Sequence, residues 1–301
     1  MLPFLQKLTY IVQDPPPDFA FELTESGIAF ARPSSGGETS IGFEALEPDV
    51  LSLSPLGDNV LRADALAARI RAVSGAGAGR KRRRAVVILP DFAARVAVLT
   101  FDKFPSDAAE QLGLVRFRMK KSVPFDVESA AVSYQPMSGG KGRTEVVVVV
   151  AALEIVARYE AAVRAAGLHP GLVTTSAVAM SELVPSNGIS VVARITGKYL
   201  SVLVMNGAAL KLVRTVELPE VTDEEILGVL LPTLAYVEDE LGAPATRIAL
   251  CGFGQNGVVP GWTAELQVPV EPLRSRFGMP NGFNAGLLGY LESTTSGVKA
   301  A

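Results

Sequence analysis

Cysteine and histidine are almost missing from this 301-residue sequence, which contains one of each, Cys251 and His169. A single cysteine excludes an internal disulfide, and the two residues together are too small a set for a Cys/His zinc site. A Ser-His-Asp triad would have to use His169, which lies between Gly167 and Pro170 in a predicted helix-to-strand turn, a poor position for a buried base. Both residues are therefore interpreted as structural.

Long apolar runs are missing as well. The longest, Val146–Leu153, is far shorter than the roughly 20 residues that span a bilayer. The segment Met1–Tyr10 lacks the apolar core of a signal peptide. No Walker A motif, helix-opening G-x-G-x-x-G or nucleophile elbow occurs in the sequence. We expect a soluble protein of the reducing cytoplasm.

A dominant charge of one sign is missing too, because the net charge is only −3. The chain therefore has no general attraction to nucleic acid, and no nucleic-acid partner is expected. One local exception is Arg80–Arg84, which is basic throughout. Such a run could mark an acidic-lipid or nucleic-acid patch, but the overall charge favours a solvated loop before the apolar strand Ala85–Leu89.

What the sequence does contain is a duplicated pattern in a chain that is 49% apolar and 20% charged. Phe19–Ala31 reads as a hairpin, and a second unit starts near Gly188 with three strands, Ile189–Ile195, Leu200–Asn206 and Leu210–Leu218. Each half opens with a strand-turn-strand and continues through helix and strand. This order predicts an α/β protein with two lobes around a cleft.

Several local patterns predict individual elements. The β-branched run Val146–Val150 predicts a central strand buried on both faces. Ser106 is expected to cap the helix that follows it in the chain. Near the C-terminus the pattern predicts a strand close to Leu266–Val270 and a short helix over Ala285–Leu291.

The order of elements from Leu99 to Leu183 carries a family resemblance. A strand ending in Phe104-Pro105 leads into a basic helix and then a Ser-Val-Pro-Phe-Asp segment from Ser122. The valine strand follows, and then a helix that closes on the Ala-Ala-Gly-Leu sequence ending at Leu168. This order resembles that of type IV pilus assembly proteins of the PilM family, which have an actin-like fold akin to FtsA. The resemblance extends, more weakly, over about residues 19–291.

The resemblance implies an α/β, two-lobed actin-like fold (ASKHA, ribonuclease H-like) with an inserted FtsA/PilM-type subdomain. Residues 1–18 are then a flexible leader, and 19–187 form the first lobe with the insertion at about 96–167. Residues 188–291 form a reduced second lobe, followed by a flexible tail over 292–301. The second lobe lacks the usual outer subdomain, because its hairpin leads almost directly into the final long helix.

The resemblance also identifies where nucleotide chemistry belongs. In actin-like ATPases the first hairpin of each lobe cradles phosphate with backbone N–H groups, and an aspartate on each hairpin serves Mg²⁺ or water. Here the first hairpin keeps a carboxylate as Glu22, replaces a glycine by Thr24 and adds a negative charge at Glu25. The second hairpin carries Arg194 where the family has aspartate, and an arginine cannot bind a metal ion.

We therefore predict a pseudo-ATPase with no catalytic residue, no metal site and no required cofactor. ATP with Mg²⁺ is doubtful, and the residues that could still contact a nucleotide are Glu22, Thr24, Ser26, Gly197, Lys198, Gly252 and Gly254. The glycines near Cys251 form only a lone Gly-X-Gly, which is a weak signal and is also typical of a tight turn.

The resemblance implies a partner, a PilN-like inner-membrane protein whose cytoplasmic N-terminal tail lies in a groove beside the inserted subdomain. Pilus motor ATPases are a second class of partner, and the protein would be peripheral at the inner membrane through these contacts. The residues mapped to the groove are Arg116, Phe117, Lys120, Val123, Pro124 and Phe125. Val123 and Phe125 could equally be ordinary core, because sequence cannot separate exposed from buried apolar residues.

Two other functions stay open at this point. An active ATP-dependent ATPase or sugar-kinase relative would need Glu22 as its sole Mg²⁺ carboxylate, and Arg194 opposes that reading. A cytoplasmic lobe of a GspL-type secretion protein would normally continue into a transmembrane helix, which this chain does not contain.

Overall fold

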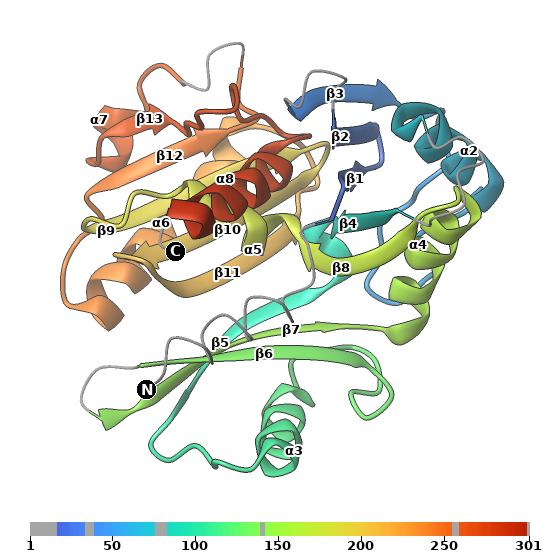
Figure 1. Cartoon of the computed structure of the whole chain (residues 1–301). Coiled ribbons are helices and arrows are strands. Elements are labelled where there is room, and N and C mark those ends of the chain that lie inside the picture. The colour runs from blue at the N-terminus through green and yellow to red at the C-terminus, as the bar shows by residue number, and fades with distance from the viewer. Residues whose placement is uncertain (1–16, 34–38, 76–82, 139–141, 255–258, 300–301) are drawn as a thin grey trace.

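The computed structural model describes residues 17–33, 39–75, 83–138, 142–254 and 259–299. Residues 1–16 of the expected leader and residues 80–82 of the basic run lie outside the described ranges. The described part forms two sheet-based lobes and a smaller third unit (Figure 1). None of its helices is long and apolar enough to cross a bilayer.

The first lobe is built on a five-stranded sheet in the order β3-β2-β1-β4-β8. Its first three strands pair antiparallel, and β4 and β8 continue the sheet in parallel. Two helices, α2 and α4, pack their apolar stripes on one face and form the first-lobe core. The bounds are β1 (Phe19–Thr24), β2 (Gly27–Pro33), β3 (Thr39–Ala45), α2 (Ala63–Ser74), β4 (Arg84–Leu89), α4 (Leu153–Ala165) and β8 (His169–Thr175).

The second lobe repeats this connectivity in the order β11-β10-β9-β12-β13, again with three antiparallel strands followed by two parallel ones. The predicted two-lobed α/β plan is therefore confirmed. The helix α6 covers its outer face and begins at a Thr222 cap. The bounds are β9 (Ile189–Thr196), β10 (Tyr199–Asn206), β11 (Ala209–Glu217), α6 (Asp223–Leu241), β12 (Arg247–Cys251), α7 (Trp262–Leu266) and β13 (Val270–Pro272).

Helices α5 (Ser176–Met180) and α8 (Ala285–Lys299) lie where the two lobes meet. The 3-10 turn η3 (Ser181–Leu183) follows α5 and leads into the second lobe. In Figure 1 they lie between the two sheets, where residues from both lobes form one apolar cluster, the inter-lobe core. The helices touch at Gly289, where an added Cβ would lie 2.0 Å from the carbonyl oxygen of Ala179. This contact admits glycine alone.

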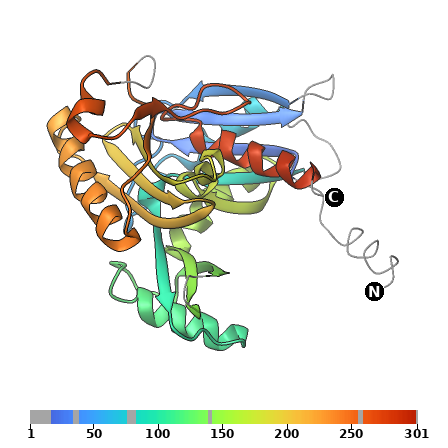
Figure 2. The ribbon, with the colours of Figure 1, turned by 90° about the vertical axis from the view of Figure 1, so that its left-hand side faces the viewer.

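A third unit is inserted between β4 and α4. Its antiparallel sheet, in the order β5-β7-β6, packs against one helix, and Figure 2 shows it extending away from both lobes. It follows the 3-10 turn η1 (Asp91–Ala93) and consists of β5 (Arg95–Phe101), α3 (Ala108–Met119), β6 (Ala131–Ser138) and β7 (Thr144–Ala151).

The insertion is shorter than the expected range of about 96–167. Helix α4 lies within that range, but Ile155, Tyr159 and Val163 on its apolar face are buried in the first-lobe core. The inserted unit therefore ends at Ala151, because α4 has its packing partners in the lobe and not in the inserted sheet.

The valine strand β7 is not buried equally on both faces. Val146, Val148 and Val150 are buried under α3, whereas Val147 and Val149 are partly buried against the inter-lobe core. The inserted unit has only one helix, which covers one face of its three-stranded sheet. The other face of the sheet is covered only where a lobe contacts it.

Four local predictions need correction. Asp107, not Ser106, caps α3, because its Oδ1 accepts the amides of Ala109 and Glu110 at 2.9 and 3.0 Å. The strand expected near Leu266–Val270 is the end of α7 and the start of β13. Helix α8 continues to Lys299, so its predicted end at Leu291 is wrong, and the segment expected as a flexible tail from residue 292 is helical up to Lys299.

The glycine contact between α5 and α8 leads to a paired prediction. Gly289→Ala should lower the free energy of unfolding by about 1–3 kcal/mol, because the new methyl group must push the helices apart. Gly228→Ala on the exposed side of α6, where nothing lies within 4 Å, should instead raise it by up to about 1 kcal/mol. Urea unfolding curves of both variants measure the difference in sign; equal effects would contradict the packing described here.

Candidate functional site at the lobe interface

Two strands at equivalent positions of the duplicated sheets bring a carboxylate and a guanidinium face to face. Glu22 on β1 lies beside Ile88 of the parallel strand β4, and Arg194 on β9 lies beside Cys251 of the parallel strand β12. The two residues thus occupy matching positions of the two lobes. Each precedes its hairpin turn by the same distance along the strand.

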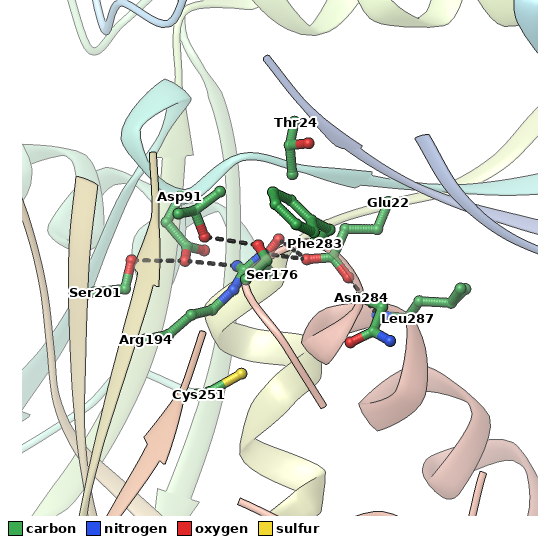
Figure 3. Close-up of polar contacts among 12 residues, drawn as sticks. Glu22, Thr24, Asp91, Ser176, Arg194, Ser201, Cys251, Phe283, Asn284 and Leu287 are labelled. Carbon is green, nitrogen blue, oxygen red and sulfur yellow. Dashed lines mark hydrogen bonds and ion pairs between the residues drawn. The ribbon is translucent and has the colours of Figure 1, made fainter. Parts of the chain in front are cut away.

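Arg194 forms an ion pair with Glu22 across the lobe interface. Its Nη2 lies 2.7 Å from Glu22 Oε1, and its Nη1 lies 3.5 Å from Oδ2 of a second carboxylate, Asp91 (Figure 3). All three side chains are withdrawn from solvent, with 3% of Arg194, none of Glu22 and 5% of Asp91 exposed. Arg194 also donates to the carbonyl of Gly282 at 2.7 Å.

Asp91 enters the site from the end of β4, where the chain turns into η1. Its Oδ1 accepts the amide of Ala177 at 2.6 Å, and its Oδ2 accepts the hydroxyl of Ser201 at 2.8 Å. Ser201 lies on β10, so Asp91 also contacts both lobes. Sequence reasoning missed this residue; its only signal was an acid placed directly after a buried strand and Pro90.

Glu22 binds the start of α8. Its Oε2 accepts the amide of Leu287 at 2.7 Å, and its Oε1 accepts the hydroxyl of Ser176 at 2.6 Å. Leu287 lies in the first turn of α8 and Ser176 at the first position of α5. Unpaired helix N–H groups and the helix dipole favour negative charge at such positions. The two carboxylates therefore hold both inter-lobe helices by their N-terminal turns.

Two acids share one guanidinium in this cluster. Burial raises the pKa of Glu22 and of Asp91 above their ordinary values, against the opposing effect of Arg194. For Arg194, burial alone would lower the pKa, but the nearby carboxylates outweigh it and the pKa is raised. Arg194 therefore stays charged, and the site carries more negative than positive charge in its fully ionised form.

The residues present do not fit ATP with Mg²⁺. The space beside Arg194 is a cavity of about 20 Å³, whereas ligand pockets usually measure roughly 300–1,000 Å³. Phe92 and Tyr199 narrow it with ring centroids 4.6 Å apart. Both oxygens of Glu22 are already hydrogen-bonded, and no group of three potential metal ligands occurs in the described parts of the chain.

The remaining residues predicted to contact a nucleotide are held in structural interactions. Thr24 hydrogen-bonds the backbone of its own turn and the hydroxyl of Ser26. Lys198, in the turn between β9 and β10, is paired with Glu217 at the end of the neighbouring strand β11. These contacts stabilise the hairpin turns. The side chains of Thr24 and Lys198 are therefore already engaged in interactions within the chain.

The glycines of the third element are also tightly placed. Gly252 has φ +83°, and a Cβ there would lie 2.3 Å from the carbonyl oxygen of Ile195. Gly197 and Gly254 have positive φ values of 57° and 51°. Gly252 is therefore required by the approach of two backbones, which accounts for the Gly-X-Gly pattern without a ligand.

A second cavity, of about 160 Å³, lies where the inserted unit meets both lobes. We call it the groove. Its lining residues include Phe92 from the first lobe, Arg95, Pro124 and Phe125 from the insertion, and Val213 and Thr215 from the second lobe. Arg95 is exposed at its rim and forms no ion pair with any described residue.

The six residues predicted to bind a partner do not form one surface. Pro124 and Phe125 line the groove, and Val123 is buried in the core of the inserted unit. Phe125 also packs against both that core and the first-lobe core. The others belong to the α3 side: Arg116 pairs with Glu128 at 3.8 Å, Lys120 is exposed, and Phe117 is 73% exposed.

Comparison with solved structures identifies the fold. The chain is similar to a PilM-PilN type IV pilus biogenesis complex, with TM-score 0.72, 19% identity, and coverage of 92% of this chain and 99% of the other. It is also similar to the cytoplasmic domain of EpsL from the Vibrio cholerae type II secretion system, with TM-score 0.54, 16% identity and coverage of 92% and 94%.

A Bacteroides thetaiotaomicron protein with an actin-like ATPase fold matches with TM-score 0.53 and 12% identity, over 96% of this chain and 98% of the other. No protein-family model and no curated protein matches the sequence. At these identities the likeness shows the fold, and the expected PilM-like, actin-like fold is confirmed.

The ion-pair cluster predicts a severe effect of removing its one cation. Arg194→Met should lower the free energy of unfolding by about 3–5 kcal/mol, because it leaves two buried carboxylates without a counter-charge. Arg62→Met, which removes an exposed ion pair with Glu47, should cost less than about 1 kcal/mol. Urea unfolding at neutral pH measures both.

Acid should relieve the Arg194→Met defect. A buried carboxylate with a raised pKa contributes stability below its unfolded-state pKa and loses it as the pH rises through its folded-state pKa. The deficit relative to wild type should therefore shrink as the pH falls from about 7 toward 5, and adding Glu22→Gln and Asp91→Asn should recover part of it. A deficit independent of pH and unchanged in the triple variant would contradict this account.

Proposed function

We propose that this chain is a non-hydrolysing actin-like scaffold of a type IV pilus or related secretion platform. In this role it binds the short cytoplasmic tail of a PilN-like membrane protein in the groove. The observation that carries the proposal is the Arg194–Glu22–Asp91 cluster, which occupies the centre of the lobe interface with the chain's own side chains.

The cluster supports a role that does not need nucleotide. Two facing carboxylates at a lobe interface would repel each other unless a cation bridged them. Here the second lobe supplies Arg194 in place of an acid, so the attraction between lobes is built into the chain. A protein that closes in this way has no use for a metal–nucleotide complex to bring its lobes together.

The groove supports the binding role. Its walls come from both lobes and from the insertion, and they are mostly apolar, with Arg95 as an exposed cation at the rim. A cavity of about 160 Å³ is smaller than a typical small-ligand pocket, but it has room for one apolar side chain of an extended peptide that keeps an acidic or polar residue outside. The similarity to a solved PilM-PilN complex supports a PilN-like protein as the source of that peptide.

A pilus platform is favoured over a type II secretion platform by the closeness of the fold. The TM-score is 0.72 with the pilus complex and 0.54 with EpsL. A location at the inner membrane, reached through the partner's tail, follows from the same proposal.

Nucleotide should not stabilise the protein. With about 1 mM MgATP or MgADP we expect no change in Tm and no phosphate release above that of a heat-treated sample, whereas a ligand at 100 times its Kd would add about 2.7 kcal/mol. A clear rise in Tm, or steady ATP turnover that is lost in Glu22→Ala, would favour the ATPase alternative.

Tail binding should depend on the groove. A synthetic peptide of the cytoplasmic tail of the PilN-like protein from the same genome is titrated by calorimetry against wild type, Arg95→Glu and Lys103→Glu. Arg95→Glu should weaken binding about tenfold or more, because it reverses the charge at the groove rim. Lys103→Glu makes the same charge change on an exposed loop and should leave the Kd unaltered. Equal effects of the two variants, or no binding at all, would contradict the proposal.

A further inference from the structure

Helix α6 has an apolar surface that the described chain leaves partly exposed. Its buried side faces the second sheet through residues such as Leu230 and Val237. The opposite side exposes Leu231 by 45% and Tyr236 by 41%, together with the small residues Gly228 and Ala235. These residues follow one another at helical spacing, so they form a continuous stripe, which we call the α6 stripe.

Acidic residues flank the α6 stripe at both ends, and the helix contains no basic residue. None of these acids takes part in an ion pair among the described residues. They are Asp223, Glu224 and Glu225 in the first turn and Glu238, Asp239 and Glu240 near the end. The surface as a whole is apolar in its middle and negative at its ends.

Helix α3 presents the opposite combination. Phe117 is the most exposed large apolar side chain of the described residues, at 73%, and the exposed Gly113 precedes it by one turn. Lys120 and Lys121 follow it and are exposed. Lys120 lies near enough to the exposed Asp126 to help lower the pKa of that carboxyl, but neither lysine forms an ion pair within 4.0 Å with a described residue. We call Phe117 with these two lysines the α3 knob.

We propose that the α3 knob of one copy of this chain docks on the α6 stripe of a second copy. Phe117 would place its ring against the small residues Gly228 and Ala235, beside Leu231, since an aromatic anchor gains most where it covers apolar surface. Lys120 and Lys121 would then face acids at an end of α6. The charge signs are complementary, and unlike charges across an interface steer and orient association.

The two surfaces lie on different parts of the molecule. The α3 knob is on the inserted unit that extends from the lobes, whereas α6 covers the outer face of the second lobe (Figures 1 and 2). A contact between unlike surfaces is heterologous, so each copy keeps one free knob and one free stripe after pairing. The assembly is therefore head-to-tail and can add further copies.

This contact is separate from the groove. Phe117 and Lys120 do not line it, and neither does any residue of α6. The assembly therefore does not rest on tail binding, and either one can fail without the other.

Sedimentation equilibrium of the full chain tests the proposal with two variants that each remove one surface. Phe117→Asp removes the knob and Leu231→Asp introduces a charge into the stripe. Leu153→Asp is the matched control, since Leu153 is 57% exposed on α4, away from both surfaces. All three positions are exposed, so each variant should fold, which thermal unfolding verifies.

The wild type and Leu153→Asp should show an average mass that rises with concentration up to about 1 mM and falls in high salt, which screens the charges. Each surface variant alone should associate at least about tenfold more weakly. An equimolar mixture of Phe117→Asp and Leu231→Asp should form a dimer and stop there, because one intact knob and one intact stripe remain to pair.

Three outcomes would overturn the proposal. The wild type could remain a monomer at the highest concentration, the mixture of surface variants could remain monomeric while the wild type associates, or Leu153→Asp could lose association as fully as the surface variants.

Discussion

One buried guanidinium determines how the two halves of this molecule meet. Arg194 from the second lobe contacts Glu22 and Asp91 from the first, and all three are removed from water. Burying three charges carries a large desolvation cost, which close ion pairing and hydrogen bonds from helix amides offset. Such a cluster tolerates little displacement, so its main consequence is a defined relative position of the lobes.

The rest of the interface depends on that position. Glu22 and Asp91 hold the first turns of α8 and α5, and these helices carry much of the apolar core between the sheets. Asp91 also lines the groove, whose walls come from three separate units. The groove therefore has its shape only while the lobes are held together, and the ion-pair cluster links the lobe contact to the proposed binding site.

The duplication of the fold explains why the presence of an arginine at position 194 matters so much. Glu22 and Arg194 occupy matching positions of the two sheets, so changing the charge at one of them converts repulsion between lobes into attraction. The similarity to proteins of actin-like fold concerns the backbone, and each lobe of this chain begins with an antiparallel hairpin. What the hairpins do is decided by a few side chains at the interface.

The sequence alone determined the elements and their order, because strand alternation, helix periodicity and turn residues such as Gly242 are local signals. Together with the family resemblance, it also placed Arg194 where a metal-binding acid was expected. Only the tertiary structure revealed Asp91, whose partners Arg194 and Ser201 lie 103 and 110 residues away. It also assigned α4 to the first lobe and separated Phe117 from Phe125, because packing between distant segments decides which residues share a surface and sequence spacing does not encode it.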